Sequence, residues 1–353
     1  MNAFRRLNSS VDGQVSGLVR RIHVERGTGR MIVLLVVAFA LFAVLKPSVF
    51  VSALNLQNIG LATPEIGILA LAMMLAMSTG GIDLSVVGIA NGSAIAMSIT
   101  WSSLSSRMGE DAVRMWPLLI LVGLVVGLVG GLVNAVLIAV AGVTPILATL
   151  ATMQIFNGLG LVVTGGRVLY AFPQSMSNLG QVTVAGVPLL FFIFVIVAIV
   201  IGIIMSKTAM GRSILLQGAN PTASLYSGID PKRTLLATYV TTGLLAGVAG
   251  IVIVMRNPTA SADYGASYTL LVIVIAVLGG TNPNGGFATV LGVVLAALTL
   301  QVVSSGFTAM RLSSYQYSVA QGVILILIMM IDQIDWKRLL RRRRANAAMA
   351  VSS

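Results

Sequence analysis

A short polar stretch, Ser78-Thr79-Gly80-Gly81-Ile82-Asp83-Leu84-Ser85, separates two apolar runs. Its paired glycines can end one helix, and the Asp83 carboxylate can cap the next helix by accepting from free backbone N–H groups. A carboxylate beside so much hydrocarbon is costly, so it requires either this capping role or a functional one. The functional interpretation is that Asp83 and Ser85 hold a broken-helix element that borders a polar pathway.

A related stretch, Leu278-Gly279-Gly280-Thr281-Asn282-Pro283-Asn284-Gly285-Gly286, occurs later in the chain. Both stretches combine paired glycines and polar side chains at a helix break, and an apolar run of small residues follows each. The similarity indicates an internal repeat, which in membrane transporters places the site between the two halves. Thr281 and Asn282 therefore join the candidate pathway residues.

Uncharged polar residues also occur inside the apolar runs. They can line a track suited to hydroxyl-rich solutes, or each can hydrogen-bond to a neighbouring helix; the residues are Asn91, Asn134, Thr149, Gln154 and Asn157. Glu65, next to Pro64, is expected near the outer interface. The runs lack the series of acids and bases found in proton-driven pumps, which favours a neutral cargo and an energy source elsewhere.

The sequence gives little support for a metal site or for an enzyme. The chain has no cysteine and one histidine, His23, so disulfides and thiolate metal sites are excluded and no metal site is expected. There is no convincing nucleophile or paired acid and base. No GxxxxGK[ST] sequence is present, so ATP cannot bind by that route. We expect neither an enzyme nor a bound cofactor.

The composition indicates an integral membrane protein. The chain has 353 residues, of which 57% are hydrophobic and 9% are charged, whereas soluble domains carry roughly a quarter charged residues. The predicted fold is all-α with about ten transmembrane helices (8–10), some broken; the expected spans are 31–46, 59–79, 86–102, 116–139, 145–164, 188–205, 235–255, 269–280, 287–306 and 317–333. The segments 86–102 and 269–280 fall short of the roughly 20 residues that a straight span needs.

Basic residues set the expected topology. Sixteen of the 22 Lys and Arg residues lie in the arm 1–30, the loop 206–234 and the tail 336–353. The positive-inside rule then places both termini in the cytoplasm, on either side of the transmembrane domain, 31–335. The basic tail is interpreted as an anchor that favours anionic lipid, and no nucleic acid is expected.

The polar loop Lys207–Arg233 contains its own helix signals. Asn220 suits an N-cap, Pro221 the first helical position and Gly228 a left-handed stop, which predicts a helix of about two turns from Pro221 to Ser227. Such a helix is too short to span a bilayer. It is either an ordinary turn in a connecting loop or a segment to which a partner protein outside the membrane binds.

Glycines recur at helix-packing spacing in two predicted spans. They are Gly123, Gly127 and Gly131 in one, and Gly243, Gly247 and Gly250 in the other. We expect close helix contacts there.

Together these motifs resemble the permease subunits of ribose-type ABC sugar importers. The resemblance covers roughly residues 50–335: a GGIDLSV stretch at 80–86, Thr144-Pro145-Ile146 through Thr149-Leu150, LGGT at 278–281 followed by Gly285-Gly286, and a loop motif. The loop motif comprises Gly211, Arg212, Gly218, Asn220, Pro221, Ala223, Ser227, Gly228 and Ile229. The segments 225–229 and 233–235 are also similar to permeases that import the autoinducer-2 signal.

The resemblance implies that those loop residues couple the chain to a cytoplasmic ATP-binding protein. It also implies a second permease subunit, identical or paralogous, a periplasmic sugar-binding protein, and a location in the bacterial inner membrane. Arginines of the outer loops are the candidate docking residues for an acidic partner surface, unless they are simply solvated: Arg107, Arg114, Arg167, Arg256 and Arg311. The alternative is a self-sufficient secondary transporter or facilitator of a small neutral solute.

Overall fold

The computed structural model describes residues 26–313 together with 316, 319, 322 and 323. The chain divides into two compact units, residues 1–306 and 307–353, and nearly all described residues belong to the first. Most of the arm 1–30, the tail 336–353 and most of the expected span 317–333 lie outside the described residues. Residues 26–30 of the expected arm are helical, because α2 already begins at Arg26.

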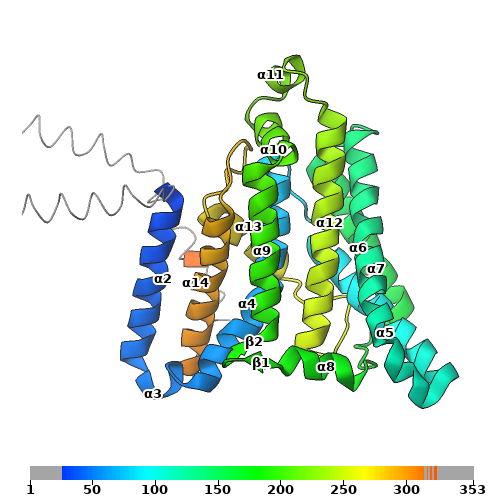
Figure 1. Ribbon diagram of the computed structural model, residues 1–353, viewed down its shortest axis with the longest axis vertical. Helices are drawn as coiled ribbons and strands as arrows, with labels where there is room; N and C mark the ends of the chain where they lie inside the picture. The colour runs from blue at the N-terminus through cyan, green and yellow to red at the C-terminus, as the bar shows by residue number, and fades with distance from the viewer. Residues whose placement is uncertain (1–25, 314–315, 317–318, 320–321, 324–353) are drawn as a thin grey trace, which may run out of the picture. The chain divides into compact units, whose positions relative to one another are not determined.

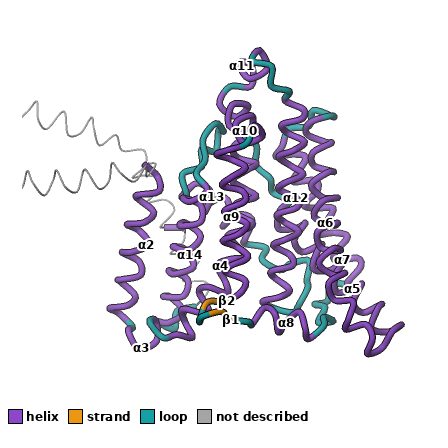
Figure 2. The backbone as a smooth tube through the Cα atoms, in the orientation of Figure 1, coloured by secondary structure: helices purple, strands orange, loops and turns teal. Residues whose placement is uncertain are grey.

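Long apolar helices dominate the described part (Figures 1 and 2). Seven stretches there are long and apolar enough to cross a membrane, one being the continuous stretch Val86–Ala139. The helices are α2 (Arg26–Leu45), α4 (Ala53–Ser78), α5 (Val86–Met108), α6 (Trp116–Ala139), α7 (Pro145–Thr164), α9 (Leu189–Lys207), α12 (Pro231–Arg256) and α14 (Val290–Ala309). The mostly helical membrane fold expected from the composition is confirmed for the described residues.

The predicted boundaries agree closely for α6 and α7 and less well for α5. That helix continues to Met108 instead of ending near residue 102, because no glycine or proline lies between that residue and Gly109, whose φ of +54° ends the helix. A 3₁₀ helix, η1 (Gly109–Met115), then joins it to α6. The helix α13 (Tyr268–Leu278) is short, as predicted.

Short elements connect the long helices. They are α3 (Pro47–Phe50), α8 (Gln174–Gln181), strands β1 (Thr183–Val184) and β2 (Val187–Pro188), α10 (Ala209–Ala219) and α11 (Pro221–Tyr226). The two strands pair antiparallel across Ala185 and Gly186, which both have positive φ, as a two-residue hairpin requires. In Figure 1, α11 lies at one end of the bundle and α3, α8 and the hairpin lie at the other.

The core of the first unit is built around α4 and α12. α4 is buried without interruption from Ala62 to Ser78, and most of α12 after Thr242 is buried as well. A helix that is apolar on every side needs neighbours on every side. The peripheral helices α7 and α9 expose apolar faces instead, as expected for surfaces that meet lipid or another subunit.

The predicted close glycine contact is present between α6 and α12. A Cβ on Gly127 would lie 2.8 Å from the Gly247 Cα, and one on Gly131 would lie 2.9 Å from the Gly243 Cα. The two backbones therefore meet with no side chain between them, which only glycine permits.

Candidate functional site

The polar break between α4 and α5 forms a buried cluster around Asp83. Its Oδ1 accepts hydrogen bonds from the Ser85 backbone N–H (3.0 Å) and the Ser85 hydroxyl (2.6 Å), and its Oδ2 accepts from the Thr242 hydroxyl (2.7 Å). The Asn134 amide nitrogen donates to the Ser85 hydroxyl at 2.7 Å. The Asp83 carboxylate thus joins the break to α12, and the Ser85 hydroxyl joins it to α6.

The predicted capping role of Asp83 is only partly correct. Ser85 is the N-cap residue of α5, and Asp83 binds its backbone N–H without reaching the N–H groups of the first helical turn. The carboxylate therefore serves mainly to link α5 to α12. Within the described residues it has no ion-pair partner, and burial raises its pKa while hydrogen bonds from Ser85 and Thr242 oppose that rise.

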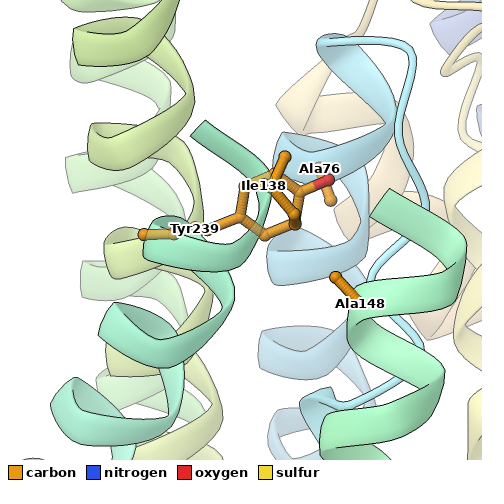
Figure 3. Packing of buried hydrophobic residues seen from close by; sticks show 5 residues of the cluster. Ala76, Ile138, Ala148 and Tyr239 are labelled. Atoms are coloured by element: carbon orange, nitrogen blue, oxygen red, sulfur yellow. The ribbon is translucent and has the colours of Figure 1, made fainter. Parts of the chain in front are cut away.

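Two further residues close this cluster. The Thr149 hydroxyl in α7 accepts from the Leu84 backbone N–H (3.1 Å) and donates to the Pro145 carbonyl (2.8 Å), which fixes the start of α7 against the break. Figure 3 shows the Tyr239 ring of α12 among Ala76, Ile138 and Ala148.

The two similar breaks lie against each other. The Gly286 backbone N–H donates to the Ser78 carbonyl at 3.1 Å, and a Cβ on Gly80 would lie 3.4 Å from the Asn284 carbonyl oxygen. Gly218, near the end of α10, fits between them: a Cβ there would lie 2.6 Å from the Gly286 nitrogen and would overlap the Ser78 carbonyl. Three backbone segments from distant parts of the chain therefore meet where only glycine fits.

The loop beyond this junction forms the short helix that the sequence predicts. The Asn220 side chain accepts from the Ala223 backbone N–H at 2.9 Å, and Pro221 occupies the first turn of α11. The helix ends at Tyr226, with Ser227 as its C-cap and Gly228 at a φ of +80°. Asp230 then caps α12 by accepting from the Lys232 N–H at 2.9 Å. The helix pair α10 and α11 therefore forms a stiff projection and not a loose connection.

The tip of this projection is apolar. The side chain of Tyr226 is 87% exposed and that of Leu225 is 56% exposed, at the end of the bundle marked by α11 in Figure 1. Exposed large apolar side chains within a polar loop are typical of a protein-binding surface. Neither residue was among the sequence candidates, although an apolar pair inside a basic loop is a signal that could have been used.

A second polar cluster lies nearer the opposite end. Glu65 in α4 is completely buried, and its carboxylate accepts from the Arg256 guanidinium (2.6 Å) and the Tyr264 hydroxyl (2.9 Å). The Asn91 amide nitrogen in α5 donates to the carbonyls of Ala262 and Tyr264 at 2.9 and 2.8 Å. Glu65 lies inside the bundle, and its partner Arg256 is the last residue of α12; its expected position near the outer interface stays a prediction.

Comparison with known proteins bears directly on this arrangement. Residues 55–331 match the family model described as "Branched-chain amino acid transport system / permease component". The chain is 32% identical over 314 residues to the autoinducer 2 import system permease protein LsrD of Escherichia coli K12, covering 86% of this chain and 91% of that protein. It is also 32% identical over 293 residues to the ribose import permease protein RbsC of Bacillus subtilis 168, covering 82% and 88%. No solved structure matches.

The chain belongs to this permease family. Its seven apolar stretches and its relatives identify the permease as a multi-pass protein of the bacterial inner membrane. A transport permease component moves its cargo without chemical change, which agrees with the expectation that the chain is not an enzyme.

The structure brings together only some of the predicted pathway residues of the permease. Asp83, Ser85, Asn134 and Thr149 form one cluster, and Asn91 belongs to the second. The Asn282 amide nitrogen donates to the Gly285 carbonyl at 2.8 Å, so this side chain shapes its own turn. Thr281 is buried, Asn157 is partly buried, and Gln154 is exposed on the outer face of α7.

Sequence reasoning missed two partners in these clusters. Thr242 binds Asp83 although 159 residues separate the two, and Tyr264 binds Glu65 across 199 residues. A single sequence does not show which polar residues on neighbouring helices form pairs, because spacing along the chain does not determine which helices pack together.

The predicted docking arginines of the permease differ in their surroundings. Arg107, Arg114 and Arg167 are exposed, and Arg311 belongs to the second unit. Arg256 does not lie free in a loop: it is the last residue of α12, with a third of its side chain exposed and its guanidinium bound to Glu65. Its charge is neutralised internally, which removes it from the free docking set.

Proposed function

We propose that the chain is the translocating subunit of an ATP-driven importer for a sugar or a similarly small hydroxylated solute. The family match supports a permease component, and relatives named for ribose and for autoinducer 2 support this cargo class. The observation that carries the proposal is the capped helix α11 together with the preceding end of α10, whose Gly218 is in backbone contact with both helix breaks.

In this proposal α11 docks in a cleft of a cytoplasmic ATPase. Leu225 and Tyr226 provide the apolar contact, and the caps at Asn220 and Gly228 keep the helix rigid. When the ATPase closes, α11 and α10 move together, and Gly218 transmits the displacement to Ser78 and Gly286. Since Ser78 begins the stretch that carries Asp83, the movement reaches the buried cluster.

The proposed topology places α11 and both termini in the cytoplasm, with about ten spans in all. The concentration of basic residues in the arm, the loop 206–234 and the tail supports this orientation. A second permease subunit, identical or paralogous, would cover part of the exposed apolar faces. A periplasmic binding protein would dock at the end opposite α11, where Arg107, Arg114 and Arg167 are exposed.

The uncharged pathway candidates fit a neutral cargo. The Asn134 side-chain oxygen is buried and has no hydrogen-bond partner in the described part of the chain. Beside the Asp83–Ser85 pair, it would offer an acceptor to a solute hydroxyl once the cluster opens. Selectivity among such solutes is proposed to reside mainly in the binding protein.

The docking surface is tested with Leu225→Ser/Tyr226→Ser, which removes the apolar tip and leaves Asn220 and Gly228 intact. We expect the ATPase to be lost during purification of the assembled importer, with its affinity weakened by about tenfold or more, because truncated apolar anchors dominate interface energies. Tyr170→Ser is the control, since that ring is 73% exposed but belongs to the segment following α7.

Two results would count against the proposal. Retention of the ATPase at wild-type strength in the double variant would show that α11 is not the docking element. Uptake by the purified permease without any ATPase would favour the facilitator instead.

A further inference from the structure

The segment that connects α12 to α13, residues 257–267, folds back into the bundle. It follows Arg256, at the end of the bundle away from α11 (Figure 1), yet its Ala262 reaches the Asn91 side chain in α5 and the Gly160 position in α7. Both Ala260 and Ala262 are buried, at 1% and 4% exposure. We call residues 257–267 the plug segment.

Polar contacts at both of its ends hold the plug segment. Glu65 binds Arg256, immediately before the segment, and also binds Tyr264 near its end. Asn91 donates to two carbonyls inside it. Leu169 and Ala260 exchange a pair of backbone hydrogen bonds, at 2.8 and 2.9 Å, which joins the segment to the stretch after α7.

The side chains of the segment bury little aliphatic surface. The two that are fully buried are alanines, whose methyl groups remove only a small apolar area from water, and the Tyr264 ring is partly buried against Tyr268. Hydrogen bonds can be exchanged for hydration once water reaches them, unlike an apolar core, whereas breaking the buried Glu65 ion pair is costly and holds the segment in place. The plug segment therefore has the physical character of a part that detaches once that ion pair is broken.

We propose that the plug segment closes the translocation pathway on the side opposite α11, and that Glu65 is the residue that holds it closed. This inference rests on the proposed transport function. It adds a second site, besides α11, at which transport is controlled. When the plug segment opens, Tyr264 and Arg256, which immediately precedes the segment, separate from the Glu65 carboxylate. The Asn91 amide then leaves its carbonyl acceptors in the segment and faces the pathway.

Thiol labelling of the permease tests the role of Glu65. The chain contains no cysteine, so Ala260→Cys carries a unique thiol that is buried when the plug segment is closed. We expect slow reaction of this thiol with a membrane-impermeant maleimide. Adding Glu65→Gln should accelerate labelling by about tenfold or more, because loss of the charge leaves Arg256 without its partner.

Two further variants keep the test decisive. Tyr264→Phe removes one hydrogen bond to Glu65 and should raise the labelling rate by a smaller factor, even if Glu65→Gln folds poorly. Glu110→Gln makes the same chemical change at an exposed position of η1 and should leave the rate unchanged. Equal labelling rates in the Glu65, Tyr264 and Glu110 variants would overturn the assignment.

A disulfide tests the movement itself. Hydrogen-bonded antiparallel pairs such as Leu169 and Ala260 hold their Cα atoms at about 5.5 Å, within the range that a disulfide bridges. Oxidising Leu169→Cys/Ala260→Cys in the assembled importer should lower ATP hydrolysis by about tenfold, as expected when a conformational step is blocked, and reductant should restore it. Unchanged hydrolysis in the oxidised variant would show that the segment does not move.

These results separate this inference from the proposed function. The labelling contrast needs only the permease in a membrane, so it can succeed although no ATPase binds α11. Conversely, α11 can pass its docking test while the Glu65 variants label at the wild-type rate.

Discussion

Asp83 is a buried carboxylate whose three hydrogen bonds come from neutral donors. Such a group stabilises the fold only while its partners remain in place, and it becomes costly when they separate. A residue with this property suits a site that exchanges protein partners for a solute. The same logic applies to Glu65, which differs in having a cation as a partner.

Replacing Asp83 should separate its structural and electrostatic roles. Asp83→Leu leaves the donors of Ser85 and Thr242 unpaired in the core, and we expect a loss of roughly 2–4 kcal/mol of stability. Asp111→Leu, at an exposed position, is the matched control. Thermal unfolding in detergent measures the difference, and equal melting temperatures for the two variants would contradict the role of the cluster.

Asp83→Asn should behave differently with pH. Burial raises the pKa of Asp83 above its ordinary value, so the stabilising contribution of the protonated group is complete at low pH and is lost as the pH rises through the folded-state pKa. The asparagine variant imitates the protonated group and cannot lose a proton. Its melting temperature relative to wild type should therefore increase as the pH is raised, and a difference independent of pH would be the contrary result.

At the scale of elements, the junction of α10 with the two breaks is closely packed, backbone against backbone. Gly218 is flanked by the Ser78 carbonyl and the Gly286 nitrogen, whereas Gly228 has open space around its Cβ position and is required only for its φ of +80°. One glycine is thus needed for lack of room and the other for backbone conformation.

This distinction predicts different effects for two alanine substitutions. Gly218→Ala should push α10 away from the breaks, cost about 1–3 kcal/mol of stability through overpacking, and uncouple ATP hydrolysis from uptake. Gly228→Ala should cost about 1–2 kcal/mol through backbone strain, without displacing α10, and should leave coupling largely intact. Hydrolysis and uptake measured together in proteoliposomes compare the two; full coupling in Gly218→Ala would remove the junction from the mechanism.

Much of the element scale could be predicted from the sequence. The spans 116–139 and 145–164, the short helix from Pro221 and the presence of close helix contacts at the glycines of α6 and α12 follow from local signals: hydrophobic runs, caps and spacing. The partners of Asp83 and Glu65 depend on which helices pack together, and local signals do not contain that information. The plug segment was missed for the same reason, because Asn91 and Tyr264 become neighbours only in the folded bundle.

At the scale of the whole molecule, membrane orientation decides whether α11 and the plug segment act from opposite sides of the membrane. We expect single cysteines at Ser227 and at Ser103 to react with an impermeant maleimide from opposite faces of the membrane, the former only from the cytoplasmic face. Both side chains are exposed, which makes the labelling direct. Reaction of both from the same face would be incompatible with an importer driven through α11.

The glycine contact between α6 and α12 has a mechanical consequence. Because the Gly127 and Gly131 backbone lies directly against the Gly243 and Gly247 backbone, the two helices cannot slide or roll over each other without a backbone clash. They form one strut that connects the region of α11 with Arg256. In the proposed topology, a displacement of α11 by the ATPase is carried along this strut to Arg256, so that closure of the ATPase and release of the plug segment are coupled.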